Sequence, residues 1–115
     1  MAALKRRVIA FREERNWRPF HTPKNLAMAL AIEAGELQEL FLWKSEEEIL
    51  TLLSNDVFAT RVQEEMADIL IFLLYLAEAA GVDLSEAVKA KISKNQEKYP
   101  VTTSFGSSKK YNEPE

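Results

Sequence analysis

Hydrophobic side chains recur along most of the chain at intervals of three and four residues, the spacing of one face of an α-helix. The pattern begins with Leu4, Val8 and Phe11 and predicts a first helix that ends near Asn16. Residues 17–23 contain two prolines, so they predict a structured loop. Glycine and proline are few, with Gly 3 and Pro 4, which favours helices over a turn-rich β-sandwich.

Capping signals mark where the next two helices begin. Thr22 followed by Pro23 is typical of an N-cap and a first helical residue, and predicts a second helix that runs to about Trp43. Ser45 and Glu48 form a capping-box pattern and predict a short helix over residues 46–53.

The second half of the chain predicts two more helices. A third long helix follows a break at residues 54–56 and stops near Gly81, a good C-terminal cap. Asp83 begins a fourth helix, which Pro100 ends. We therefore expect an all-α helical bundle of four to five helices over residues 1–100, followed by a polar tail at 101–115 that contains Phe105 and Tyr111.

Two of these helices carry a glutamate inside an otherwise apolar stripe. The stripe of the second helix is Leu26, Leu30, Glu33, Leu37 and Leu40, and that of the third long helix is Phe58, Val62, Glu65, Ile69, Phe72 and Leu76. Glu36 follows Glu33 by three residues, and Asp68 follows Glu65 by three. Each pair is therefore adjacent on its helix surface.

Two carboxylate pairs, each with one member inside an apolar stripe, indicate a metal site. Burying a carboxylate among leucines is costly unless it is paired or binds a metal, and two unit charges 4 Å apart repel by about 4 kcal/mol at an effective dielectric of 20. All-oxygen ligands favour Mg²⁺ or Mn²⁺ over zinc or iron. We expect Glu33, Glu36, Glu65 and Asp68 to hold the metal. The alternative is that they are solvated acids paired with Arg61 or a lysine.

Composition removes several classes of protein. The chain has 115 residues, no Cys, one His and a net charge of −3. These counts exclude disulfides, thiolate zinc sites, paired-His sites and His-rich oxidase bundles, and they argue against binding to nucleic acid polymers. The longest apolar run, residues 69–77, is too short to span a membrane, and residues 1–7 show no signal-peptide pattern. We expect a cytoplasmic protein.

The carboxylate motif makes the chain similar to a known family. Glu33-Ala34-Gly35-Glu36 with Glu65-Met66-Ala67-Asp68 resembles the ExxE…ExxD signature of the MazG-like all-α nucleoside triphosphate pyrophosphohydrolases. Flanking blocks at residues 20–26, 33–41, 43–44, 64–70, 95–100 and 107–111 look like the dCTP pyrophosphatase branch. The resemblance runs from about residue 11 to 113, although Phe72 stands where relatives often have tyrosine.

The resemblance implies a Mg²⁺-dependent hydrolase that converts dCTP, or modified dCTP, to the monophosphate and pyrophosphate and so cleans the nucleotide pool. It implies catalytic roles for Glu33 and Glu36, one of which would orient the attacking water. Two other hypotheses remain: the same chemistry on dUTP or a broad set of nucleotides, and a non-catalytic helical interaction module.

Several residues are candidates for binding the nucleotide. Trp17 and Trp43 flank the second helix, where aromatic rings either stack on a base or belong to the core. His21 either contacts the base or sugar, or fixes its loop by a hydrogen bond. Lys91, Asn95 and Lys98 share a helix face that is either solvated or binds phosphates. The resemblance favours the binding role for the two tryptophans and for this helix face, and adds Lys44 and Tyr99.

The third long helix also predicts self-association. Residues 69–77 are apolar on every face except for the Tyr75 hydroxyl, and a small bundle covers such a helix poorly. We expect the bundle to be completed by another subunit, and the family resemblance implies a homodimer or homotetramer. Phe20, Phe41 and Phe58 are expected in the core.

Overall fold

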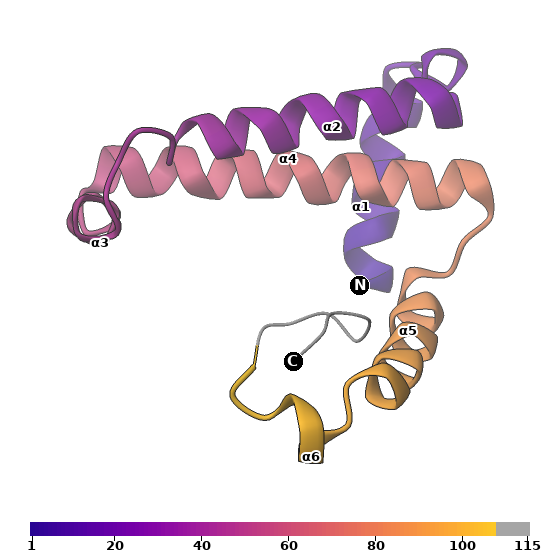
Figure 1. Cartoon of the computed structure of the whole chain (residues 1–115). Helices are drawn as coiled ribbons and strands as arrows, with labels where there is room; N and C mark the ends of the chain where they lie inside the picture. Colours follow the sequence, from indigo (N-terminus) through magenta and orange to yellow (C-terminus); the bar gives the residue numbers. More distant parts are fainter. Residues whose placement is uncertain (108–115) are drawn as a thin grey trace. The chain divides into compact units, whose positions relative to one another are not determined.

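A computed structural model describes residues 1–107, whose helices are shown in Figure 1. They are α1 (Ala2–Glu14), the 3₁₀ helix η1 (Arg18–Phe20), α2 (Pro23–Glu39), α3 (Glu46–Leu53), α4 (Asp56–Ala80), α5 (Leu84–Lys98) and α6 (Val101–Ser104). Residues 1–107 contain no strand, so the all-α prediction is confirmed. The chain divides into two compact units, residues 1–82 and the segment that begins at residue 83.

The predicted caps set the helix boundaries. The Thr22 side chain accepts a hydrogen bond from the backbone N–H of Asn25 at 3.2 Å and caps α2. Ser45 and Glu48 form the complete capping box at the start of α3. Gly81 ends α4 with a φ of 68°, a left-handed conformation that glycine adopts without strain.

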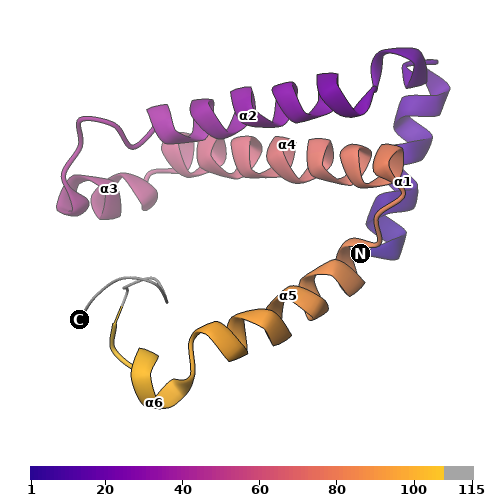
Figure 2. The same ribbon diagram turned by 45° about the vertical axis from the view of Figure 1, so that its right-hand side comes forward.

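In the first unit, α2 lies along α4, and α1 and α3 also pack against α4. Figures 1 and 2 both show α2 and α4 side by side and running in opposite directions. A hydrogen bond joins α1 to α4: the buried Tyr75 hydroxyl donates to the Val8 carbonyl oxygen at 2.7 Å. The two long helices therefore form a frame that holds their facing side chains at fixed positions.

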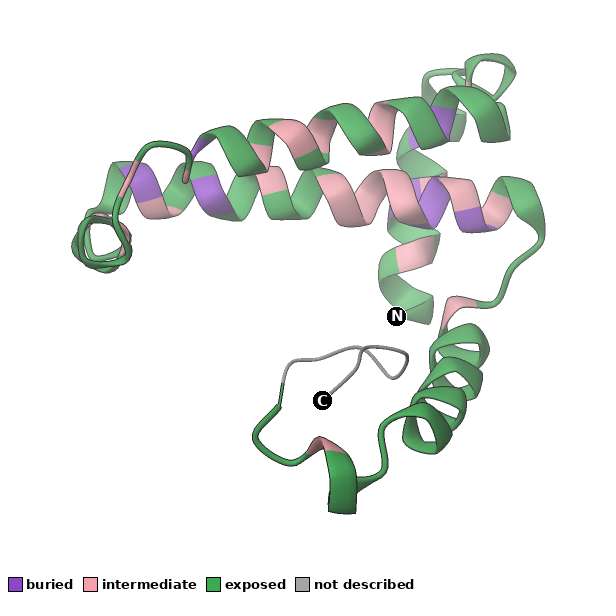
Figure 3. Ribbon diagram, in the orientation of Figure 1, coloured by how far each residue is buried: buried purple, intermediate pink, exposed green. Residues whose placement is uncertain are grey.

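The buried residues form two groups at opposite ends of the α2–α4 pair, with half-buried residues between them (Figure 3). One group contains Leu40, Phe58 and Val62, flanked by Leu37, Phe41 and Leu52. The other contains Val8, Arg12, Leu26, Leu74, Tyr75 and Ala77. Glu33 and Glu65 lie in sequence between the members of these groups on α2 and α4. The apolar groups therefore support a polar centre.

Some expectations about this unit are wrong. α2 ends at Glu39 rather than near Trp43, because the N–H groups of Leu40 and Phe41 donate to carbonyl oxygens three residues back instead of four, and Trp43 adopts a left-handed φ of 62°. Phe20 is 68% exposed, so it is no core residue, whereas Phe58 is buried and Phe41 half-buried. Phe20 is outside the core because it is the last residue of η1, which lies in a polar loop.

In the second unit, α5 begins at a cap in which Asp83 accepts a hydrogen bond from the Glu86 N–H at 3.1 Å. The predicted fourth helix is thereby confirmed. The first residues of the predicted tail form the short helix α6, and the predicted tail residue Tyr111 lies outside the described residues. Within residues 1–107, no helix combines the length and apolar character required to cross a bilayer.

Candidate functional site

Three carboxylates converge at the centre of the α2–α4 pair. One oxygen from each of Glu33, Glu36 and Glu65 lies within 4.8 Å of the other two. Glu33 and Glu36 come from α2, and Glu65 comes from the facing turn of α4. They meet because Glu33 and Glu36 are three residues apart on one helix and Glu65 faces them from the other. This convergence is the one expected from the two stripes.

Two of these carboxylates have oxygens that lack a partner. The Oε2 atoms of Glu33 and Glu65 are buried and accept no hydrogen bond within the described part of the chain. Burial, a hydrogen bond with the Glu65 carboxyl and the charge of Glu36 raise the pKa of Glu33 to about 7. Arg61 forms no ion pair with these acids in residues 1–107. The alternative of acids neutralised by Arg61 is therefore not observed.

The donor set suits a hard divalent cation. An octahedral Mg²⁺ with oxygens at about 2.1 Å places neighbouring ligands about 3 Å apart and opposite ligands about 4 Å apart. Oxygens within 4.8 Å of one another need only small rotations to meet these separations. A cation would also satisfy the buried oxygens, which are costly to leave unpaired. Glu33, Glu36 and Glu65 therefore fit a metal site, although the geometry does not identify the ion.

Asp68, the fourth predicted ligand, lies beside this cluster but outside it. It is exposed on α4, and its negative charge contributes to the raised pKa of Glu33. Its side chain lines a cavity of about 590 Å³ between α1, the η1 loop and α4. The cavity is lined mainly by apolar and aromatic residues, including Leu4, Val8, Phe11, Trp17, His21, Ile71, Phe72 and Tyr75. Two predicted nucleotide-binding residues, Trp17 and His21, thus share a cavity with Asp68.

Aromatic rings in tilted and edge-to-face contact form one wall of this cavity. The His21 ring lies 4.6 Å from the Tyr75 ring, and Trp17 packs edge to face against Phe11 at 5.7 Å. The buried Nδ1 of His21 has no hydrogen-bond partner among residues 1–107, so this atom does not fix the loop. Burial and the charge of Arg12 lower the pKa of His21, which keeps its ring neutral near pH 7.

Two features beside this wall were not predicted from the sequence: the buried Arg12 and the hydroxyl contact of Tyr75. The Arg12 guanidinium is 2% exposed, lies 5.7 Å from the Tyr75 ring centre and donates to Glu13 at 2.7 Å. Glu13 also binds Arg18 of the η1 loop at 2.8 Å. Arg12 follows Val8 by four residues, on the apolar face of α1. A charged residue at such a position is the same signal that identified Glu33, and it could have identified Arg12.

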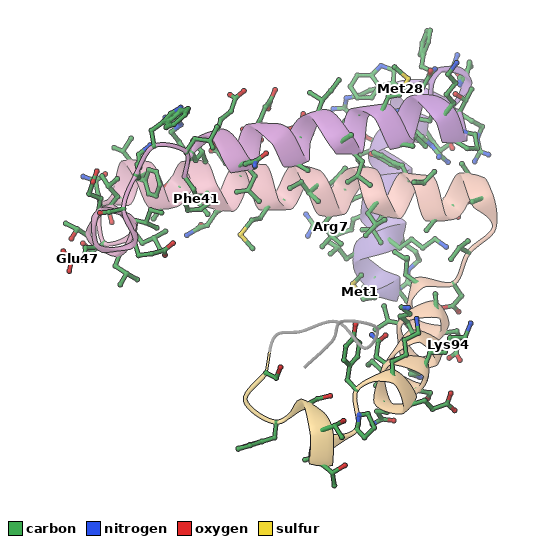
Figure 4. All side chains as sticks on the ribbon, viewed as in Figure 1. Met1, Arg7, Met28, Phe41, Glu47 and Lys94 are labelled. Atoms are coloured by element: carbon green, nitrogen blue, oxygen red, sulfur yellow. The ribbon has the colours of Figure 1, made fainter. Side chains whose placement is uncertain are left out.

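A second cavity of about 520 Å³ lies on the other side of the carboxylates. Its lining is mixed in charge: Glu36, Glu39, Leu40, Lys44, Leu52, Phe58, Arg61 and Glu65. Lys44, predicted to bind the nucleotide, lies here. Phe41, labelled in Figure 4, packs edge to face against the cavity residue Phe58 with ring centres 6.0 Å apart.

The other predicted binding residues lie outside these cavities. Trp43 is 97% exposed and lines neither of them. Lys91, Asn95 and Lys98 are exposed on α5, which also carries Lys94 (Figure 4), and Tyr99 follows its end. The positive charges of Lys98 and Lys94, with some desolvation, lower the pKa of Lys91. These side chains form a cationic helix face in the second unit, and their role stays a prediction.

Comparison with known proteins gives consistent relatives. A model of the MazG-like family matches residues 28–113. The chain is 46% identical over 101 residues to dCTP pyrophosphatase 1 of Bos taurus, covering 88% of this chain and 60% of the relative. It is 43% identical over 103 residues to dCTP pyrophosphatase 1 of Homo sapiens, covering 90% and 61%. The chain thus spans about three fifths of the length of these curated relatives.

A solved structure is also similar. The crystal structure of a pyrophosphatase from Archaeoglobus fulgidus superposes with a TM-score of 0.80 at 44% sequence identity. The match covers 87% of this chain and 92% of that one.

Proposed function

The chain belongs to the MazG-like family, and from this premise we propose that it is a nucleoside triphosphate pyrophosphohydrolase. It hydrolyses dCTP, or dCTP modified on the base, to the monophosphate and pyrophosphate. The observation that carries the proposal is the cluster of Glu33, Glu36 and Glu65, whose oxygens meet within 4.8 Å beside an aromatic cavity. A carboxylate cluster of this kind suits metal-assisted phosphate chemistry.

The carboxylates provide the reaction centre of this proposal. Glu33, Glu36 and Glu65 would hold Mg²⁺, with Mn²⁺ as a substitute, and Asp68 would complete the ligands. The bound metal would supply the positive charge that lets an acidic site accept a triphosphate. Glu33 or Glu36 accepts a hydrogen bond from water and orients it toward the α-phosphorus. The water oxygen forms a bond to the α-phosphorus while the bond from this phosphorus to the bridging oxygen breaks, so that pyrophosphate leaves with the electron pair and the glutamate takes up the proton of the water.

The aromatic cavity takes the base and sugar. Its volume of about 590 Å³ and its lining by Trp17, His21 and Phe72 suit a planar heterocycle. Base stacking on an aromatic side chain is worth about 1–3 kcal/mol. His21 is neutral near pH 7, so it presents one donor and one acceptor to a base or sugar. Asp68, at the edge of the same cavity, links it to the carboxylate cluster.

The remaining predicted residues act on the phosphates or between subunits. Lys91, Asn95, Lys98 and Tyr99 would bind the β- and γ-phosphates through the cationic face of α5. The protein would act as a cytoplasmic homodimer or homotetramer. Met28, Ile32 and Met66 on α2 and α4 are 55%, 60% and 56% exposed, and a subunit interface would bury them. Trp43, exposed at 97%, would pack against a nucleotide in a neighbouring subunit.

A product analysis tests the reaction. The purified chain is incubated with Mg²⁺ and a panel of deoxynucleoside triphosphates, and the products are separated by chromatography. We expect monophosphate and pyrophosphate, formed fastest from dCTP or a 5-modified dCTP. The same products formed fastest from dUTP, or from many bases, would keep the chemistry and overturn the base preference.

Two controls separate catalysis from contamination. The Glu36→Ala variant, purified in the same way, should lose turnover even in excess Mg²⁺, because it lacks a proposed ligand. Adding a chelator to the wild type should stop the reaction, and Mg²⁺ should restore it. A protein without turnover on any nucleotide would instead favour the helical interaction module.

A further inference from the structure

We propose that Arg61, together with Lys44, forms a subsite with a further set of contacts to the pyrophosphate part of the substrate in the second cavity, in addition to those proposed for the cationic face of α5. This inference rests on the proposed pyrophosphohydrolase function and deepens it by assigning a direction to the bound nucleotide. In the sequence, Arg61 is only a candidate counter-charge for the acids. Its position in a cavity indicates a more specific role.

The order of side chains along α4 supports this direction. Arg61, Glu65, Asp68 and Phe72 follow one another at steps of four, three and four residues, so they lie along one face of the helix. At a rise of 1.5 Å per residue they extend over about 16 Å. A cation comes first, then two carboxylates, then an aromatic ring. The substrate has the matching order of terminal phosphates, reacting phosphate and base.

Each of the two cavities is lined by one end of this row of side chains. Glu36 and Glu65 line the second cavity, which also holds Arg61 and Lys44. Asp68 and Phe72 line the aromatic cavity. An α-phosphorus at the carboxylates with its base in the aromatic cavity therefore leaves the second cavity for the β- and γ-phosphates.

Both cations are available for an anion. In residues 1–107, neither Arg61 nor Lys44 forms an ion pair or a side-chain hydrogen bond, although acidic residues surround them. The guanidinium of an arginine can donate two parallel hydrogen bonds to a phosphate group. An unpaired arginine beside an acidic cluster is thus suited to a phosphate that a metal holds from the other side.

The charge of the cavity makes this binding conditional on the metal. Glu36, Glu39 and Glu65 carry three negative charges against the two positive charges of Lys44 and Arg61, a net charge of −1. This cavity repels a polyanion. Glu33, which would share the cation, adds one more negative charge, so one divalent cation on the carboxylates brings the net charge of the site to about zero and removes this repulsion. Pyrophosphate should therefore bind only when Mg²⁺ is present.

Calorimetric titration of the full chain with inorganic pyrophosphate tests the subsite directly, without turnover. We expect no binding in chelator and measurable binding in Mg²⁺. Arg61→Ala should weaken binding in Mg²⁺ by roughly fivefold to tenfold, the range expected when one charged hydrogen-bond donor is lost at a partly exposed site. Arg61→Lys should retain part of the affinity, because it keeps the charge but loses the fork of donors.

Arg6→Ala provides the matched control. Arg6 is an exposed arginine of α1 that lines neither cavity, and its removal changes the net charge of the protein by the same amount. Its pyrophosphate affinity should stay within about twofold of the wild type, since distant exposed charges are largely screened by salt. Affinity for deoxycytidine monophosphate, which lacks the leaving group, should be unchanged in Arg61→Ala.

The outcomes separate the subsite from the function. Equal pyrophosphate affinity in wild type and Arg61→Ala would overturn the subsite, as would an equal loss of monophosphate affinity. If these results accompany normal nucleotide hydrolysis, the proposed function stands without this subsite. Arg61-dependent, Mg²⁺-dependent pyrophosphate binding in a chain that hydrolyses no nucleotide would instead support the subsite and contradict the function.

Discussion

Replacing Glu65 with glutamine should stabilise the metal-free protein and remove its response to Mg²⁺. Glutamine keeps the size and hydrogen-bonding capacity of the side chain but carries no charge. In the wild type without metal, the charge of Glu65 lies close to those of Glu33 and Glu36. The variant therefore relieves repulsion in the absence of metal and loses a ligand in its presence.

The magnitude follows from the separation of the oxygens. At 4.8 Å, one pair of unit charges repels by about 3.5 kcal/mol at an effective dielectric of 20 and by about 0.9 kcal/mol in water. Removing the Glu65 charge relieves two of the three pairs. Because Glu36 is exposed and Glu33 partly protonated near pH 7, a net gain of about 1–3 kcal/mol is reasonable. A gain of 1 kcal/mol raises the Tm of a domain this size by roughly 4 °C.

Calorimetric melts at pH 7 in chelator and in Mg²⁺ measure both effects. The wild type should gain about 2.7 kcal/mol when Mg²⁺ reaches 100 times its Kd, and Glu65→Gln should lose most of that gain. Glu64→Gln, which removes the exposed neighbouring charge on α4, is the matched control and should retain the wild-type response. A lower metal-free Tm in Glu65→Gln would refute the reasoning, because it would mean that this carboxylate has a stabilising partner.

Three further predictions concern the aromatic cavity and the acidic centre. Tyr75→Phe removes the hydroxyl that donates to the Val8 carbonyl oxygen. It should cost about 1 kcal/mol of stability and raise KM more than it lowers kcat. The control Ser54→Ala removes a comparable hydroxyl–carbonyl hydrogen bond and should leave KM unchanged. Trp17→Ala should raise the KM for dCTP by about fivefold or more through lost stacking, while Phe20→Ala in the same loop should not; equal effects of the two would contradict a base site at Trp17. In chelator, the pKa of Glu33 near 7 instead of 4.5 means that the folded state holds this proton more tightly than the unfolded state. The stabilisation that protonated Glu33 contributes to the folded state is therefore fully present below pH 4.5 and is lost as pH rises through 7. The urea midpoint of the wild type should decrease over this range, and that of Glu33→Gln should not.

The fold could largely be predicted because its signals are local. Thr22 and Ser45 begin helices and Gly81 ends one through contacts within a few residues, and all three behave as their types predict. The end of α2 was misplaced because residues 40–43 are apolar and continue the helical spacing, while the turn there depends on a positive φ at Trp43. No residue preference of tryptophan signals such a conformation.

The carboxylate cluster could be predicted because two intruding glutamates break two regular stripes, and antiparallel packing of α2 and α4 brings the breaks together. The aromatic cavity could not be predicted, since it depends on how α1 crosses α4 and how the η1 loop folds back. The contacts of Arg12 and His21 with the Tyr75 ring join residues that are distant in sequence. Nothing in the spacing along one helix reports such a contact.

The most direct test of the pyrophosphohydrolase reaction is hydrolysis of dCTP by the Mg²⁺-loaded chain in water enriched in ¹⁸O. Water attack at the α-phosphorus, oriented by Glu33 or Glu36, places the heavy oxygen in the monophosphate and leaves pyrophosphate unlabelled. Mass spectrometry of the two products should show this distribution, and Glu36→Ala should form neither product. Heavy oxygen in pyrophosphate or inorganic phosphate, with unlabelled nucleotide, would contradict the reaction proposed for this site.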